Sequence, residues 1–494
     1  MMEHLPVLVV IIPLIGAYTS LVGGWVDRRY AFPIAFINIL TQFTAALLLT
    51  VRVMQEGVVR YNLGDWLPPW GIEYVVDRLN IYVLLILLFL SLLCCAYSKR
   101  SIGMEIEERK HTGFYTIFLL LVAGVTGITV TGDIFNLYVF LEISSLAAYT
   151  LVSSGRGGKG LVAGFNYLVM GSVSACFILL GIGHLYMLTG TLNMADLARV
   201  LPPLYTSTTL HTAFVFFIVG LSIKTALFPL HLWLPDAYTH APSTVSALLS
   251  TVVSKMGVYA TIRILFSVFT VEFVVGYFPV MEFLSWLAAI AIIAGSLLAI
   301  AQRDLKRMLA YSSVGQMGYI LLGVGMVNQL AMTGGILHML NHAVMKGCLF
   351  MVAGAFIFRT GFRRIDDLKG MGKRMPWTSA ALVIGALSMI GIPPTVGFMS
   401  KWYLALGAIE AGQWVFLAVI LASSLLSAVY FWRLLEYVYF REGEGGVEGG
   451  TGDVPLPMLI PMLVLAAACL LFGIFVSIPL SLIDPVAESL LGGV

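Results

Sequence analysis

The sequence predicts an all-α polytopic membrane protein with about fourteen transmembrane helices. Of its 494 residues, 59% are hydrophobic and 11% are charged, and the mean hydropathy is +0.95. A soluble domain carries about 25% charged residues. The apolar residues also form stretches of about 20 residues, the length that an α-helix needs to cross a bilayer. The net charge of +2 gives no reason to expect nucleic acid as a partner.

Fourteen stretches of spanning length follow one another, bounded by charged residues or by glycine and proline. They are residues 5–24, 31–51, 79–98, 112–130, 134–152, 161–189, 210–234, 242–269, 280–302, 308–327, 330–358, 376–408, 412–440 and 455–478. Some of them contain an internal glycine, proline or charge. These are the stretches that carry information about function.

The distribution of Lys and Arg predicts the orientation of the helices. The odd-numbered loops contain 18 of these residues and the even-numbered loops contain four. Cytoplasmic loops are enriched in positive charge, so we expect the odd loops in the cytoplasm and both termini on the outer side of the cell membrane. Arg263 and Arg433 lie toward the ends of their helices, where we expect their long side chains to reach the interface.

The helices group into two sets of five. Residues 1–111 contain helices 1–3, residues 112–269 helices 4–8, residues 270–440 helices 9–13 and residues 441–494 helix 14. Because five is odd, the second set enters the membrane from the opposite side, which indicates an inverted repeat. The fourth helix of each set has a lysine near a proline: Lys224 with Pro229, and Lys401 after Pro393-Pro394. We therefore expect breaks in helices 7 and 12.

The sequence contains no recognisable cofactor motif. Its five cysteines lie in apolar stretches without C-x-x-C spacing, which argues against a disulfide framework or an iron–sulfur site. Neither a G-x-G-x-x-G after a strand nor a P-loop is found. We expect no cofactor, no metal ion, and no redox or hydrolytic site in this chain.

Charged residues in the middle of predicted helices are the main indication of function. An ionisable group at the bilayer centre costs roughly 2.5–3.5 kcal/mol, so it is expected to face polar groups or water. Glu142 is the only carboxylate near the centre of a predicted helix, and we expect it to pair with Lys224. The alternative is a permanent ion pair that only fixes helix packing. Lys255 lies in the middle of helix 8, without an acidic residue within two turns.

Helix 11 carries three polar residues on one face. His338, His342 and Lys346 are spaced four residues apart, which places them on the same side of a helix. The spacing favours a proton relay or a hydrated polar stripe; metal ligation and histidines with ordinary core partners are the alternatives. A low-dielectric interior favours neutral lysine, so Lys255, Lys346 and Lys401 are candidates for exchanging protons.

The proline breaks predict hydrated sites. Pro229 and Pro393-Pro394 leave backbone carbonyls without donors, which a membrane tolerates only where protein or cavity water satisfies them. His231, Asp236 and His240 follow the first break. We expect these three near the end of helix 7, as accessory residues.

Four long motifs resemble those of a known family. They are LSIKTALFPLHLWLPDAYTHAPSTVSALLSTVVSKMGVYATIR, DLKRMLAYSSVGQMGYI, NHAVMKGCLFMVAGAF and IPPTVGFMSKWYLALG. They are similar to the antiporter-like subunits of respiratory complex I, Mrp cation/proton antiporters and membrane-bound hydrogenases, most of all to the D-type subunits of Mrp antiporters. The resemblance implies two inverted five-helix repeats, broken helices 7 and 12, and proton translocation by Glu142, Lys224, Lys255, His338, His342, Lys346 and Lys401. Some family members have glutamate at the position of Lys401.

We therefore predict a proton-translocating subunit of a multisubunit complex, with proton/sodium antiport as one form of the activity. The expected partners are the other membrane subunits of a hydrogenase-, complex I- or Mrp-like assembly, protons, sodium ions in the antiport case, and the lipid bilayer. Two other functions stay open from the sequence: a secondary antiporter that works alone, and a quinone-binding redox subunit. The sequence also leaves open which complex is involved and in which direction Lys401 passes protons.

Overall fold

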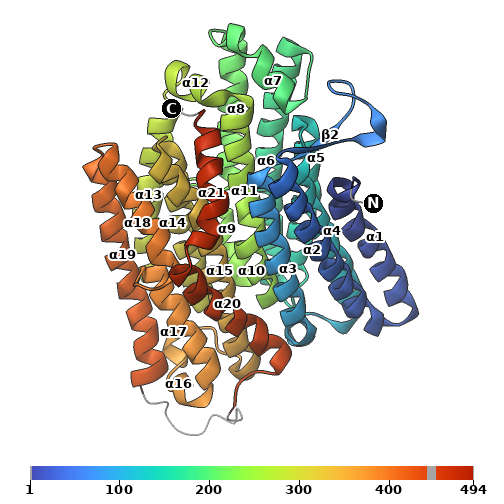
Figure 1. Ribbon diagram of the computed structural model, residues 1–494. Helices are drawn as coiled ribbons and strands as arrows, with labels where there is room; N and C mark the ends of the chain where they lie inside the picture. Colours follow the sequence, from blue (N-terminus) through green and yellow to red (C-terminus); the bar gives the residue numbers. More distant parts are fainter. Residues whose placement is uncertain (1–2, 442–451, 493–494) are drawn as a thin grey trace.

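The computed structural model describes residues 3–441 and 452–492, which are almost entirely helical (Figure 1). The first three crossings are α1 (Leu5–Val26), α2 (Ala31–Glu56) and α3 (Arg78–Glu105). The first set of five comprises α4 (His111–Val130), α5 (Ile134–Ser153), α6 (Gly158–Thr189), the interrupted pair α8 (Thr208–Lys224) and α9 (Trp233–His240), and a helix over Ser243–Val268. We call the last one the Lys255 helix; it contains α10 (Ser243–Leu248), α11 (Ser254–Ile262) and the π-helical turns Leu249–Val253 and Arg263–Val268.

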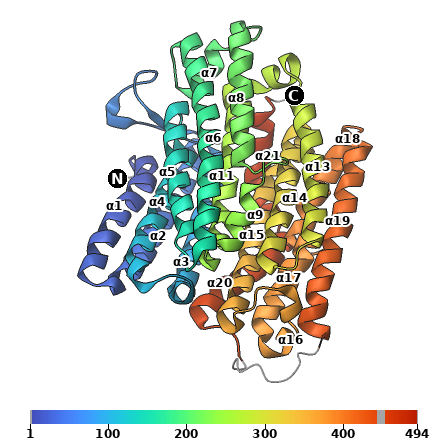
Figure 2. The ribbon, with the colours of Figure 1, turned by 180° about the vertical axis from the view of Figure 1, so that it is seen from behind.

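The second set follows the same order. It comprises α13 (Val280–Ile300), α14 (Leu305–Gly325), α15 (Gln329–Thr360), the interrupted pair α17 (Pro376–Ile390) and α18 (Val396–Glu410), and α19 (Trp414–Leu435). The chain continues with α20 (Leu456–Ile474) and α21 (Ser477–Leu490). Figure 2 shows the bundle from behind, with α1 and α2 on one side, α6 and α8 near the middle, and α13, α14 and α19 on the other side.

The number of crossings agrees with the prediction. Eleven helices among the described residues are long and apolar enough to span a membrane. The 21-residue α14 and the two interrupted pairs bring the described crossings to fourteen. The chain is thus a multi-pass membrane protein whose helices are mostly continuous.

The two sets of helices repeat at a distance of 171 residues. Both α6 and α15 contain 32 residues and end in Thr-Gly, with left-handed glycines at Gly190 (φ 72°) and Gly361 (φ 73°), 171 positions later. The turn bonds repeat as well: Ile134 N donates to Leu192 O, and Leu305 N donates to Arg363 O, both at 2.9 Å. The backbone therefore preserves a register that the residue identities do not display.

Both predicted breaks are present, but their lysines do not occupy corresponding positions. Lys224 is the last residue of α8, before the break, whereas Lys401 lies in α18, after it. The Lys401 ammonium group nevertheless reaches back to the carbonyls of Met389 and Ile390 at the end of α17, both at 3.0 Å. Lys224 is thus itself the end of the first half-helix of its pair, α8. Lys401 contacts the end of the corresponding half-helix, α17, from the other side of the break.

The last crossing is interrupted too, which was not predicted. The helix stops at Ile474 and resumes at Ser477. A Cβ on Gly473 would lie 2.1 Å from the carbonyl oxygen of Pro394, so only a glycine permits this approach to the break between α17 and α18. Two interrupted helices therefore meet inside the bundle.

A β-hairpin also departs from the predicted all-helical pattern. Strands β1 (Val59–Asn62) and β2 (Glu73–Val76) pair antiparallel and project from the upper part of the bundle in Figure 1, toward the same end as the short α7 (Met194–Val200). We call this end the hairpin face. The opposite end carries the loops in which Lys and Arg are concentrated, and we call it the basic face.

Candidate functional site

Glu142 and Lys224 form an ion pair between α5 and α8. Lys224 Nζ donates to Glu142 Oε1 at 3.1 Å and to Ser145 Oγ at 2.7 Å. The Glu142 and Lys224 side chains are 25% and 9% exposed, respectively. The Lys255 helix packs closely on this site, because a Cβ on Gly257 would lie 3.0 Å from the carbonyl carbon of Lys224. The pair is therefore held where α5, α8 and the Lys255 helix meet.

Lys255 connects the first set of helices with the second. Its Nζ lies 2.9 Å from Nδ1 of His342 in α15, and both residues are buried. The same ammonium group donates to the carbonyl of Ser250 and lies 3.3 Å from Ser254 Oγ. Ser250 belongs to a π-helical turn, in which carbonyls are shifted out of the regular helical ladder. The irregular turn thus supplies an acceptor for a buried cation.

His338 continues the polar contacts along α15. Its ring is parallel to that of His342, with an interplanar angle of 2° and centroids 6.3 Å apart. His338 Nδ1 lies 2.8 Å from Ser400 Oγ, and Nε2 lies 2.8 Å from Gln316 Oε1. Ser400 is the neighbour of Lys401 in α18. The contacts therefore extend from the Lys255 helix to α18 across the middle of the bundle.

Lys346 and Lys401 have neutral acceptors. Lys346 donates to the carbonyl of Leu309 at 2.8 Å and to the hydroxyl of Ser312. Besides its two backbone carbonyls, Lys401 donates to Ser424 Oγ at 3.1 Å, and its Nζ lies 5.2 Å from the centre of the Tyr319 ring. Hydroxyl and carbonyl oxygens accept hydrogen bonds from either charged or neutral lysine. These two sites can therefore hold the side chain in both protonation states.

The four lysines differ in their counter-charge. Within the described part of the chain, only Lys224 among them has a carboxylate oxygen within 4.0 Å. Lys255 contacts His342, Lys346 follows His342 by one turn of α15, and all three residues are buried. Like charges at such separations repel each other strongly in a low-dielectric medium. We call Lys255, His342, His338, Lys346 and Lys401 the buried row. A permanent charge on every member of this row is therefore unfavourable.

The three accessory residues lie apart from this row. His231 is buried at the break after α8 and stacks on Phe228, with centroids 5.1 Å apart. Asp236 lies 3.4 Å from Arg307 Nη1. His240 lines a cavity of about 250 Å³ at the basic face, together with Glu105, Arg156 and Arg363. The structure thus separates these residues into three different environments.

Several polar partners in the row were not predicted. Ser145, Gln316, Ser400 and Ser424 contact the expected ionisable residues. Two sequence features could have indicated these partners: Gln316 lies inside one of the four family motifs, and Ser400 directly precedes Lys401. Hydroxyl side chains are common in membrane helices, so sequence position alone does not single out the others.

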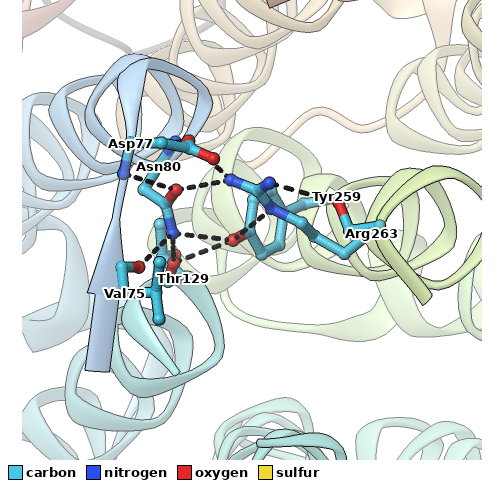
Figure 3. Close-up of polar contacts among 7 residues, drawn as sticks. Val75, Asp77, Asn80, Thr129, Tyr259 and Arg263 are labelled. Carbon is cyan, nitrogen blue, oxygen red and sulfur yellow. Dashed lines mark hydrogen bonds and ion pairs between the residues drawn. The ribbon is translucent and has the colours of Figure 1, made fainter. Parts of the chain in front are cut away.

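Arg263 and Arg433, which were expected to reach the interface, are held by partners from neighbouring elements. The Arg263 side chain is 11% exposed, and its Nη2 lies 2.6 Å from Asp77 Oδ1 (Figure 3). Arg433 donates to the carbonyls of Ile300 and Gln302, at the end of α13, at 2.8 and 2.6 Å. Acceptors offered by neighbouring helices decide these conformations, and they cannot be seen in the sequence of one helix.

Comparison with known proteins identifies the family. Residues 131–427 match the family described as NADH:quinone oxidoreductase/Mrp antiporter, transmembrane region. The chain belongs to this NADH:quinone oxidoreductase/Mrp antiporter family. Over 488 residues it is 46% identical to the N subunit of NADH-quinone oxidoreductase from Desulforudis audaxviator (strain MP104C), an alignment that covers 96% of each chain.

Another member of the family is similar over the same extent. The chain is 31% identical over 473 residues to the D subunit of the Na(+)/H(+) antiporter from Alkalihalophilus pseudofirmus (strain ATCC BAA-2126 / JCM 17055 / OF4), covering 96% of this chain and 94% of the relative. The predicted family is confirmed, and the oxidoreductase relative shares more identical residues with the chain than this antiporter relative.

A solved structure confirms the fold. A chain of the membrane-bound sulfane sulfur reductase, an archaeal respiratory membrane complex, superimposes with a TM-score of 0.91 at 32% sequence identity. The superposition covers 98% of this chain and 97% of the other. The similar chain is part of a multisubunit membrane complex.

Proposed function

We propose that this family member is the proton-translocating subunit of a multisubunit membrane complex. The observation that carries the proposal is the 2.9 Å contact between Lys255 Nζ and His342 Nδ1, which joins the two sets of helices through ionisable groups. The relatives support it, since one is named as a subunit of NADH-quinone oxidoreductase and the other as a subunit of a Na(+)/H(+) antiporter. Its partners are the neighbouring membrane subunits.

The ion pair at the first break is the switch in this proposal. Glu142 stabilises the charged form of Lys224 while the two side chains are 3.1 Å apart. When they separate, the ammonium group loses this stabilisation and releases its proton toward Lys255. The closely packed Gly257 places the Lys255 helix directly against the backbone of Lys224.

The buried row then passes the proton across the bundle. The proton moves from Lys255 to His342, on to His338, and toward Lys401 through the neighbourhood of Ser400. Lys346 holds a second position beside His342. Lys401, with neutral acceptors on all sides, exchanges the proton with water at the break between α17 and α18.

The orientation is part of the proposal. We place the basic face in the cytoplasm, because its loops hold 18 Lys and Arg against four in the loops of the other face. The hairpin face and both termini then lie on the outer side of the cell membrane. The two repeats correspond to residues 112–269 and 270–440, with residues 1–111 and 441–494 flanking them.

The test is coupled proton transport by the assembled complex in sealed vesicles. Glu142→Gln and Lys255→Met are expected to abolish transport, while co-purification shows that the complex still assembles. Full transport by either variant would refute the mechanism. His240→Gln, in the separate basic-face cavity, is the matched control and is expected to retain most of the transport.

Sodium exchange is the second candidate, favoured by the similarity to the D subunit of the antiporter. It is tested by following sodium flux in the same vesicles. Sodium movement coupled to protons and lost in Glu142→Gln would establish antiport. Vesicles that contain this chain alone distinguish a self-sufficient antiporter, which would exchange ions without partners, from a subunit.

A further inference from the structure

A buried polar cluster closes the hairpin-face end of the Lys255 helix (Figure 3). The Arg263 guanidinium lies 2.6 Å from Asp77 Oδ1 and also donates to Asn80 Oδ1. Its Nε lies 3.1 Å from the hydroxyl of Tyr259, one turn closer to the membrane centre. The amide of Asn80 donates to Tyr259 Oη and to the carbonyls of Val75 and Thr129. The cluster thus ties α3, β2 and α4 to the Lys255 helix.

Two cavities flank the guanidinium. The larger, of about 440 Å³, is lined by Asp77, Arg263 and Ser267, and its rim includes Val58, which is 54% exposed. The smaller, of about 120 Å³, is lined by Arg60, Asn80, Arg263 and Ser267. Arg263 and Ser267 line both cavities, so the guanidinium borders each of them. Water from the hairpin face can therefore reach the guanidinium from both sides.

Between this cluster and Lys255 the contacts among the described residues continue through Tyr259 and Thr129 but become less polar. Tyr259 donates to the carbonyl of Thr129 at 2.8 Å, and the Thr129 hydroxyl lies 3.8 Å from the sulfur of Met256. Met256 is 2% exposed, and a thioether is only a weak acceptor that cannot donate. The Lys255 ammonium points away from it, toward Ser250 and His342.

We propose that Arg263, fixed by Asp77 and Asn80, is a seal that prevents the proton of Lys255 from escaping to the hairpin face. The proposal rests on the proposed function, in which Lys255 carries a proton. A guanidinium has five donors and no acceptor, and it keeps its own proton, so a proton cannot be handed through it. The two ordered partners hold this donor-only group between Tyr259, on the side of Lys255, and the two cavities of the hairpin face.

Arg263 also acts through its charge. Eight residues separate it from Lys255, which corresponds to about 12 Å along the helix. At an effective dielectric constant of about 20, a unit charge at that distance changes the occupancy of an approaching cation about tenfold. The positive group lies nearer to Tyr259 than its carboxylate partner does, since Nε contacts the tyrosine while Nη2 contacts Asp77.

The experiment measures passive proton leak. The assembled complex is reconstituted into vesicles without an energy source, and an imposed pH gradient is followed with an internal dye. Arg263→Ala is expected to raise proton conductance about tenfold, whereas Arg263→Lys, which keeps a donor-only cation, stays sealed. Arg263→Ala leaves Asp77 unpaired, so the double variant Arg263→Ala/Asp77→Asn is measured as well; it is expected to leak less than Arg263→Ala but more than the wild type, because it lacks the donor-only group without leaving an unpaired carboxylate.

Two further variants identify the route. Arg60→Ala removes an arginine from the smaller cavity without touching the Lys255 helix, and it should not leak. Adding Lys255→Met to the leaking variants should abolish their leak. A leak that persists without Lys255, or no leak in the Arg263→Ala/Asp77→Asn complex while its coupled transport is normal, would overturn the seal. The second result would leave the proposed function standing, because that function is judged separately by Glu142→Gln.

Discussion

Lys224 and Lys401 lie at the corresponding breaks of the two repeats, yet their environments differ in charge. Lys224 has a carboxylate at 3.1 Å and a hydroxyl at 2.7 Å. Lys401 has two backbone carbonyls at 3.0 Å and a hydroxyl at 3.1 Å. The first site therefore favours a charged lysine for as long as the carboxylate is near. The second accepts a charged or a neutral one.

This difference separates two tasks that lysines can have in a membrane. A lysine with a removable counter-ion changes its proton affinity when the distance to that counter-ion changes, so it can respond to movement. A lysine among fixed neutral acceptors keeps a constant proton affinity, so it is suited to relay or exchange. The two breaks have similar backbone frameworks, and one carboxylate in α5 makes the environments of their lysines different.

The largest effect is expected from removing that carboxylate. Glu142→Gln leaves the Lys224 ammonium without its counter-ion, which should lower the stability of the protein by about 2–4 kcal/mol and abolish coupled transport. Thermal unfolding of the purified complex and transport in vesicles measure the two effects. The double variant Glu142→Gln/Lys224→Met should recover most of the stability but no transport. If the single variant is as stable as the wild type, the charge of Glu142 does not contribute to the stability of the protein.

Lys401→Met should cost less stability than Glu142→Gln. It removes a donor from neutral acceptors without leaving a charge behind, so we expect a loss of about 1–2 kcal/mol, together with loss of transport. The same thermal assay compares the two sites directly. An equal or larger destabilisation at Lys401 would contradict the contrast between them, whereas normal transport would remove Lys401 from the proton route.

The contact between His338 and Ser400 is expected to have a smaller effect. Ser400→Ala removes the hydroxyl that lies 2.8 Å from His338 Nδ1, at a cost of about 0.5–1.5 kcal/mol. Transport should slow but persist, because His338 keeps Gln316 and water can replace the hydroxyl. Ser400→Thr, which retains the hydroxyl, is the matched control. Identical transport rates in Ser400→Ala and the wild type would show that the proton does not pass this contact.

The smallest effects should separate the two lysine sites once more. Ser145→Ala leaves Lys224 with its carboxylate, whereas Ser424→Ala leaves Lys401 with backbone carbonyls alone. We therefore expect Ser424→Ala to slow transport more than Ser145→Ala, with stability losses of about 1 kcal/mol or less in each. Transport rates measured side by side at several pH values provide the check. The reverse order would mean that the hydroxyl is more important at the ion pair.

The fourteen crossings, the breaks near Pro229 and Pro393-Pro394, and the choice of Glu142 and Lys224 could all be reasoned from the sequence. The interruption between α20 and α21 and the β-hairpin could not. Gly473 is one of many glycines in apolar stretches, and only the nearby Pro394 carbonyl shows why this position must lack a side chain. The hairpin strands contain four residues each. Over so few residues, an alternation of apolar and polar side chains cannot be distinguished from the sequence of a polar loop.

The order of residues alone was enough to find the helices that cross the membrane and the ionisable residues within them. Each charged residue in hydrocarbon has its own free-energy cost. The sequence of a single helix is therefore enough to show that such a residue needs a polar partner or water. The partners of these residues became clear from the folded chain: Lys255 with His342, Lys401 with the end of α17, and Arg263 with Asp77. Serine hydroxyls and helix-end carbonyls occur throughout the chain, and packing alone selects which of them a buried cation contacts.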